Sequence, residues 1–157
     1  MNGNQLALKI FFDGACKNEK DVNCPMGIGV AVYINDLYCE DLSISRLYVD
    51  YELDDGTNNI AERLALQNAL QVATDLVRLD KYDTVEIFGD SKIIVNQFNK
   101  QYRMSDEKFI KYFNQCTRLN QFVKATVSWI PRENNKKADF LSKQSLIEYK
   151  QQINQNN

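Results

Sequence analysis

The chain has 157 residues, of which 44% are hydrophobic and 25% charged, and its 19 basic and 21 acidic residues leave a net charge of −2. These values are typical of one globular domain and argue against a protein that holds nucleic acid by its overall positive charge. The chain contains no histidine, which excludes Ser-His and Cys-His nucleophile pairs and every zinc site that needs imidazole.

The four cysteines are widely spaced and form no C-x-x-C pair: Cys16, Cys24, Cys39 and Cys116. This spacing disfavours a four-cysteine zinc site. No apolar run approaches the ~20 residues of a membrane span, and Met1–Ile10 lacks the apolar core of a signal peptide. We therefore expect reduced thiols in a cytoplasmic protein, or a nuclear one in a eukaryote.

The first part of the chain predicts a three-stranded antiparallel meander. Leu6–Phe12 is apolar on both faces apart from one lysine, and it ends at an Asp-Gly pair, as a buried central strand does. Gly27–Ile34 is rich in β-branched residues and predicts a second strand, and a third is expected within Ser43–Leu53. The short loops between these strands favour antiparallel pairing.

The pattern then changes to alternating helices and strands. Apolar residues recur at spacings of three and four in Ile60–Leu76, which predicts an amphipathic helix. The elements expected after it are a strand at Thr84–Phe88, helices at Ser91–Asn99 and Ser105–Phe122, a strand at Ala125–Ile130 and a helix at Lys137–Tyr149. This order predicts one α/β domain over residues 1–150, a mixed sheet with helices on its faces, followed by a disordered polar tail over residues 151–157.

Four acidic residues lie where predicted strands and helices begin or end: Asp13, Glu62, Asp90 and Asp139. Each has an ordinary structural explanation, because Asp-Gly pairs form turns and acidic residues cap helices or favour their N-termini. Together they are more informative, since strand ends in such a sheet meet at one edge, where binding sites form.

If these carboxylates converge, they cannot all stay ionised without a cation. Oxygen ligands without imidazole or thiolate favour Mg²⁺ or Mn²⁺ over zinc. Two such ions about 3.5–4 Å apart can activate water and stabilise the leaving oxygen of a phosphodiester. The acidic residues therefore indicate metal-assisted phosphoryl transfer.

Four segments resemble, in this order, the motif blocks of type 1 ribonuclease H: FFDGACKN, TNNIAERLAL, IFGDSKIIVNQF and WIPRENNKKADFLSK. The resemblance runs from Leu6 to Leu146 and is strongest to the archaeal-type and long-terminal-repeat retrotransposon branches. It implies a five-stranded mixed sheet, three antiparallel strands and then two parallel ones, with helices on both faces. It also implies an endoribonuclease that uses two Mg²⁺ or Mn²⁺ ions to cut the RNA strand of an RNA–DNA hybrid, leaving 5′-phosphate and 3′-hydroxyl ends. No protein partner is implied, and a monomer is expected.

The resemblance places the family's catalytic and metal-binding acids on the four acidic residues already found, Asp13, Glu62, Asp90 and Asp139. It assigns contacts to the hybrid to nine further residues: Gly14, Ala15, Cys16, Thr57, Asn58, Asn59, Lys92, Arg132 and Asn135. The side chains of Asn58 and Asn59 suit recognition of the RNA 2′-hydroxyl, and helix capping is an alternative that can coexist with this role.

The chain departs from the family pattern in three places. The segment KNEKDVNCPMG replaces a glycine- and proline-rich stretch, and Arg132 stands near the position of a histidine that some members carry. Asn99–Asp106 holds only Lys100 and Arg103 as cations, where many bacterial members carry a basic protrusion. We therefore expect retained catalysis but weaker, salt-sensitive binding of the hybrid.

Other interpretations of the sequence stay open at this point. Trp129 alternates with Val127 and is predicted to be a core residue rather than a base-stacking platform, whereas Lys136 and Lys137 fit a solvated pair or phosphate contacts equally well. The alternative functions are another nuclease of the same superfold, such as a 3′–5′ exonuclease or junction resolvase, and a non-catalytic hybrid-binding module. The TNN-x-x-E context and the four intact acids favour ribonuclease H over both.

Overall fold

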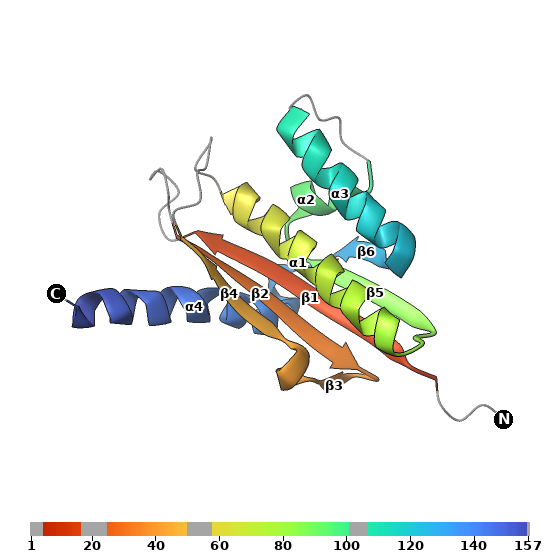
Figure 1. Ribbon diagram of the computed structural model, residues 1–157, viewed down its shortest axis with the longest axis horizontal. Coiled ribbons are helices and arrows are strands. Elements are labelled where there is room, and N and C mark those ends of the chain that lie inside the picture. The colour runs from red at the N-terminus through yellow and green to blue at the C-terminus, as the bar shows by residue number, and fades with distance from the viewer. Residues whose placement is uncertain (1–4, 17–24, 50–57, 101–106, 157) are drawn as a thin grey trace.

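The computed structural model of the protein describes residues 5–16, 25–49, 58–100 and 107–156 (Figure 1). Most of the segment expected to replace the glycine-rich stretch, and most of the Asn99–Asp106 segment, lie outside the described residues. The strands are β1 (Ala7–Cys16), β2 (Met26–Ile34), β3 (Leu37–Tyr38), β4 (Ile44–Tyr48), β5 (Thr84–Gly89) and β6 (Thr126–Trp129). The helices are α1 (Asn58–Leu79), α2 (Lys92–Phe98), α3 (Glu107–Val123) and α4 (Lys136–Gln155), with short 3-10 turns at Glu40–Leu42 and Arg132–Asn134.

The sheet has the predicted mixed topology. The central strand β1 pairs antiparallel with β2 and parallel with β5, and β6 continues the sheet in parallel beyond β5. Both β3 and β4 pair antiparallel with β2. The order β3-β2-β1-β5-β6 therefore confirms three antiparallel strands followed by two parallel ones, with the third divided into two pieces.

The division of the third strand was not predicted. Asn35 and Asp36 form the turn after β2 with φ angles of 50° and 65°, so the chain folds back at once and pairs over Leu37–Tyr38. The turn Glu40–Leu42 then separates this pair from Ile44–Tyr48, which is the part that the sequence pattern indicated. A strand of two residues is too short to show any periodicity.

The helices α1 and α4 cover opposite faces of the sheet, as Figure 1 shows. Gly14 pairs with Ile28, and a β-carbon on Gly14 would overlap the backbone of Ala61 in α1. Gly29, which points to the other face, would overlap the carbonyl oxygen of Ala138 in α4 if it carried a side chain. Glycine at these two strand positions lets both helices approach the sheet closely, and Glu62 and Asp139 near their N-terminal ends approach with them.

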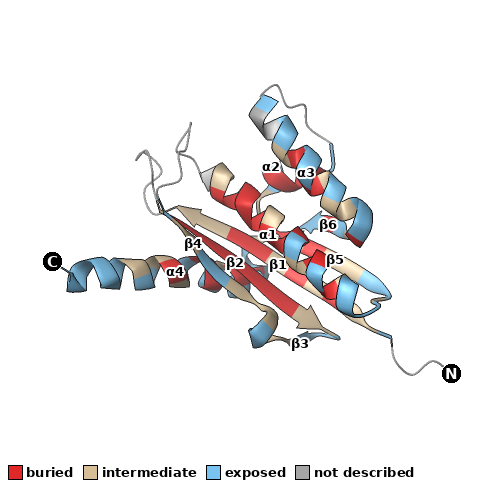
Figure 2. Cartoon of the chain, in the orientation of Figure 1, coloured by how far each residue is buried: buried red, intermediate tan, exposed pale blue. Residues whose placement is uncertain are grey.

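The main hydrophobic core lies between the sheet and α1, with α2 and α3 closing its far side. Figure 2 shows the buried residues concentrated along the middle strands and the inner side of α1. The largest fully buried apolar side chains of this core are Phe12, Leu8, Ile10, Met26, Ile28, Leu66, Leu70, Ile87 and Ile94. Each contributes roughly 1.5–3 kcal/mol by burial, so β1 and β5 form a rigid base for the residues at their ends.

Two helices are longer than predicted. Helix α1 ends at Leu79 rather than Leu76, and α4 continues to Gln155, so most of the segment expected to be a disordered tail is helical. The residues after Tyr149 include no glycine or proline, and glutamine and lysine are good helix formers. Their polar composition therefore reflects the exposed surface of this end of α4 (Figure 2). None of the described helices is both long and apolar enough to cross a bilayer.

Candidate active site

Three of the four predicted acids meet at one edge of the sheet. Asp13 on β1, Glu62 near the start of α1 and Asp90 after β5 each offer a carboxylate oxygen, and these oxygens lie within 4.8 Å of one another. Phe12 and Gly89 form the last pair between the parallel strands β1 and β5, so Asp13 and Asp90 both follow it at the same place in the sheet. The first strand does not end at Asp13 as predicted, because β1 stays paired with β2 as far as Cys16. The close approach of α1 then brings Glu62 to both aspartates.

The fourth acid, Asp139, comes from the first turn of α4 on the opposite face of the sheet. It lines the same cavity of about 390 Å³ as the other three, and its carboxyl group helps to raise the pKa of Asp13. Lys143, one turn further along α4, donates to Asp139 Oδ2 at 3.2 Å. The structure therefore gathers all four predicted acids around one cavity, from two strands and two helices.

The electrostatics of this cavity favour a bound cation. Asp13 and Glu62 are only 6% and 8% exposed. Burial, together with nearby Asp90 and Asp139, raises the pKa of Asp13 to about 7. Burial and the neighbouring Asp13 raise the pKa of Glu62 well above its ordinary value, although a hydrogen bond from the Gly14 N–H opposes this. Such a cluster of oxygen donors fits a divalent ion, because opposite charge nearby restores the carboxylate form.

One oxygen of the cluster also lacks a partner. Among the described residues, no group donates a hydrogen bond to Glu62 Oε2, which is buried. A buried acceptor without a donor costs about 1–3 kcal/mol, and more when it is charged. The carboxylates thus fit a hard metal ion for two reasons: they are oxygen ligands, and Glu62 Oε2 has no hydrogen-bond donor in the described part of the chain that would compete with the ion.

Asn135 holds the cluster in place rather than facing a ligand. It is 2% exposed, and its Nδ2 donates to the Phe12 carbonyl oxygen at 2.9 Å and to Asp90 Oδ2 at 3.1 Å. The predicted contact of Asn135 with the hybrid therefore does not match its position. Asn135 precedes the first residue of α4, and its side chain turns inward to the strand ends instead of capping the helix.

The other predicted contact residues, apart from Lys92, divide into two groups. Five of them line the carboxylate cavity, together with Ser91 and Lys143: Gly14, Ala15, Cys16, Asn59 and Arg132. Thr57 and the side chain of Asn58 lie outside the described residues. Sequence reasoning missed Lys143, and the signal that could have found it was its helical spacing of four residues from Asp139.

The two lysines before Asp139 face a different cavity. Lys136 and Lys137 line a space of about 380 Å³ beside Phe11 and Tyr33, and neither lines the carboxylate cavity. The Nζ atom of Lys137 lies 4.4 Å from the centre of the Tyr38 ring. Their position next to Asp139 in the sequence therefore does not direct them toward the acids.

The prediction that Trp129 is a core residue is wrong, because it is 42% exposed. It is the last residue of the four-residue edge strand β6, and the core that buries Val127 ends before it. Its Nε1 donates to the backbone oxygen of Asp90 at 3.1 Å, and the Nζ atom of Lys92 lies 4.8 Å from the centre of its ring. Lys92 is thus placed beside Trp129 and outside the cavity lining.

Comparison with known proteins agrees with this fold. The family model described as reverse transcriptase-like matches residues 48–145. The EbsB protein of Enterococcus faecalis is 31% identical over 143 residues, which cover 90% of this chain and 96% of that protein. The chain therefore matches a relative over almost its whole length.

Two solved structures share the architecture. Ribonuclease H1 of Halobacterium salinarum has a TM-score of 0.75 at 23% identity, with 90% of this chain and 98% of that chain covered. The compost-derived LC11 ribonuclease H1, solved with an RNA/DNA hybrid, has a TM-score of 0.71 at 26% identity, covering 85% and 92%. The strand order of the sheet and the cluster of acidic residues beside β1 and β5 define a protein of the ribonuclease H fold class. The chain belongs to the reverse transcriptase-like family and, within it, to the type 1 ribonuclease H enzymes that its motifs resembled.

Proposed function

We propose that the protein hydrolyses the RNA strand of RNA–DNA hybrids with the help of divalent metal ions. The observation that carries this proposal is the convergence of four carboxylates on one cavity beside the point where the pairing of β1 with β5 ends. The LC11 enzyme, 26% identical, was solved with a hybrid of this kind. Its shared fold supports the same substrate class for this chain.

The residues that would hold the metal are Asp13, Glu62, Asp90 and Asp139. Their oxygen donors suit two ions of Mg²⁺ or Mn²⁺, and the lack of histidine in the chain removes the usual ligand of softer metals. Bound there, the ions would activate the attacking water and stabilise negative charge on the leaving oxygen. Asn135 keeps the carboxylate of Asp90 aimed at this position, because its amide binds both Asp90 and the β1 backbone.

The remaining cavity residues are suited to bind the hybrid. Gly14, Ala15 and Cys16 present the end of β1 along the cavity wall, and Asn59 offers an amide that can recognise a 2′-hydroxyl. Arg132 and Lys143 supply positive charge for phosphate groups near the carboxylates. Attack of water on the phosphorus, with departure of the 3′-oxygen, leaves a 5′-phosphate on one RNA fragment and a 3′-hydroxyl on the other.

An end-labelled RNA–DNA hybrid incubated with the protein in Mg²⁺ or Mn²⁺ tests this proposal. Duplex DNA, duplex RNA and the single strands serve as substrate controls, and Asp90→Asn serves as a variant of the same shape without the charge. We expect cuts in the RNA strand of the hybrid alone, ending in 5′-phosphate and 3′-hydroxyl groups. A folded protein that leaves the hybrid intact in both metals would refute the proposal, and cleavage of DNA would favour another nuclease of this fold.

A further inference from the structure

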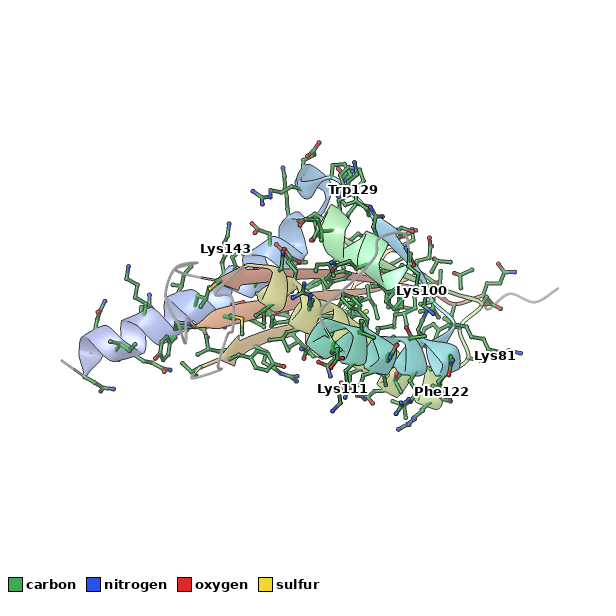
Figure 3. All side chains as sticks on the ribbon, turned by 90° about the horizontal axis from the view of Figure 1, so that it is seen from above. Lys81, Lys100, Lys111, Phe122, Trp129 and Lys143 are labelled. Atoms are coloured by element: carbon green, nitrogen blue, oxygen red, sulfur yellow. The ribbon has the colours of Figure 1, made fainter. Side chains whose placement is uncertain are left out.

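The only tryptophan of the chain lies next to the carboxylate cluster and is 42% exposed. Large aromatic side chains are usually well buried, so an exposed one beside a catalytic residue calls for an explanation. Figure 3 shows Trp129 and Phe122, another exposed aromatic residue, on opposite sides of the view. Two contacts of Trp129 distinguish it from a residue that only covers the end of β6.

The first contact holds the backbone of Asp90. The ladder between β5 and β6 ends with Gly89 opposite Trp129, where the Ile130 N–H donates to the Gly89 carbonyl oxygen at 2.9 Å. Asp90 follows immediately, and its carbonyl oxygen accepts from Trp129 Nε1 at 3.1 Å. Since Asn135 binds the carboxylate of the same residue, Asp90 is fixed at both its backbone and its side chain. Such double fixation restricts the direction in which the carboxylate points.

The second contact holds the ammonium group of Lys92. Lys92 is exposed, and its Nζ lies 4.8 Å from the centre of the Trp129 ring, within the range of a cation–π interaction. Within the described part of the chain, no acidic side chain forms an ion pair with Lys92. The ring therefore keeps a positive charge near Asp90 without neutralising it, so that the charge stays available to a phosphate group.

From these contacts we infer that Trp129 is a positioning residue that orients Asp90 through its indole N–H and holds Lys92 toward a phosphate of the substrate through its ring. The inference rests on the proposed function for its substrate and adds a role that the motif residues do not include. It predicts that the two contacts affect different properties. Loss of the N–H weakens metal binding, whereas loss of the cation weakens hybrid binding.

Three variants separate the two contacts. Trp129→Phe keeps an aromatic ring but removes the donor, and we expect the Mg²⁺ concentration for half-maximal cleavage to rise about fivefold with the hybrid KM within twofold of wild type. Lys92→Met removes the cation, and we expect the opposite pattern, a KM raised about threefold at unchanged metal dependence. Trp129→Leu loses both contacts and is expected to show both effects.

Phe122→Leu is the matched control. Phe122 is 54% exposed and has the Arg78 guanidinium carbon 5.5 Å from its ring centre, so it forms the same type of contact away from the carboxylates. We expect wild-type metal dependence and KM from this variant. If Trp129→Phe keeps the wild-type metal dependence, or if Phe122→Leu shifts it equally, Trp129 has only a structural role.

A measurement without turnover tests the same inference independently of the proposed function. Titration of Mn²⁺ into the hybrid-free protein, followed by calorimetry, is expected to give about fivefold weaker binding for Trp129→Phe than for wild type, and unchanged binding for Phe122→Leu. Equal affinities for Trp129→Phe and wild type would overturn the inference. An inactive wild-type enzyme that still shows this difference would refute the proposed function and leave the positioning role standing.

Discussion

Helix α1 carries two buried polar side chains that differ in how fully they are satisfied. Asn68 is 5% exposed, and its amide binds the Arg46 guanidinium, the Tyr48 hydroxyl at 3.0 Å and the Leu64 carbonyl oxygen at 2.7 Å. Glu62, less than two turns earlier, is buried to a similar degree, but its Oε2 has no partner among the described residues. The comparison teaches that Asn68, with complete partners, stabilises the fold, whereas the free carboxylate oxygen of Glu62 is able to bind a cation.

The largest effect expected from this comparison is on catalysis at the incomplete site. Asp90→Asn keeps the shape of the side chain but removes a charge that the metal needs, so kcat should fall by more than about a thousandfold. Folding and hybrid binding should stay close to wild type. Steady-state kinetics on one defined hybrid measures this, with Asp139→Asn expected to remove most of kcat as well. A rate above about a tenth of wild type in saturating Mg²⁺ would argue against these carboxylates as metal ligands.

Asn68→Ala tests the other half of the comparison. The substitution removes the three hydrogen bonds of a buried amide, so the free energy of unfolding should fall by about 1–3 kcal/mol. Urea denaturation monitored by circular dichroism gives this value, and kcat of the folded variant should be unchanged. A loss of activity larger than the loss of folded protein would mean that Asn68 contributes to the active site.

The pH dependence of stability sharpens the contrast between the two residues. Because the pKa of Asp13 is raised to about 7 in the folded protein, the folded state binds more protons than the unfolded state between about pH 4 and pH 7. The metal-free protein should therefore lose roughly 1–3 kcal/mol of stability as the pH rises through this window. Asp13→Asn should flatten the profile, and Asn68→Ala should lower it uniformly. Denaturation curves at pH 5 and pH 8 measure this difference in stability. If Asp13→Asn leaves the pH dependence of stability unchanged, a group other than Asp13 causes it.

The smallest effect is expected at Arg132, on the rim of the cavity. Its guanidinium stays protonated at any working pH, so it cannot act as a base and can only attract phosphate. Arg132→Ala should raise KM several-fold and lower kcat little. Steady-state kinetics on the same hybrid tests this role. Unchanged constants would make Arg132 a solvated loop residue, and a large fall in kcat alone would imply a role in the transition state.

The four acids could be predicted because each lies near a change in the periodic pattern, and the pairing between the parallel strands β1 and β5 stops just before Asp13 and Asp90. The inward direction of the Asn135 side chain could not be predicted, because a local sequence pattern does not show which way a residue before a helix directs its amide. Alternation placed Trp129 and Val127 on one face, but it does not show where along a strand the core stops. The short strand β3 carried no period at all.

Whether the unsatisfied carboxylates bind a divalent ion can be decided by calorimetric titration of Mn²⁺ into the hybrid-free wild-type protein at pH 5 and pH 8. Since Asp13 must lose its proton to act as a ligand, we expect tighter binding at pH 8, with proton release visible as a dependence of the heat on the buffer. Asp13→Asn should abolish the binding, and Asn68→Ala should retain it. Binding of equal strength at the two pH values, or in Asp13→Asn and wild type, would contradict a metal site built on these four acids.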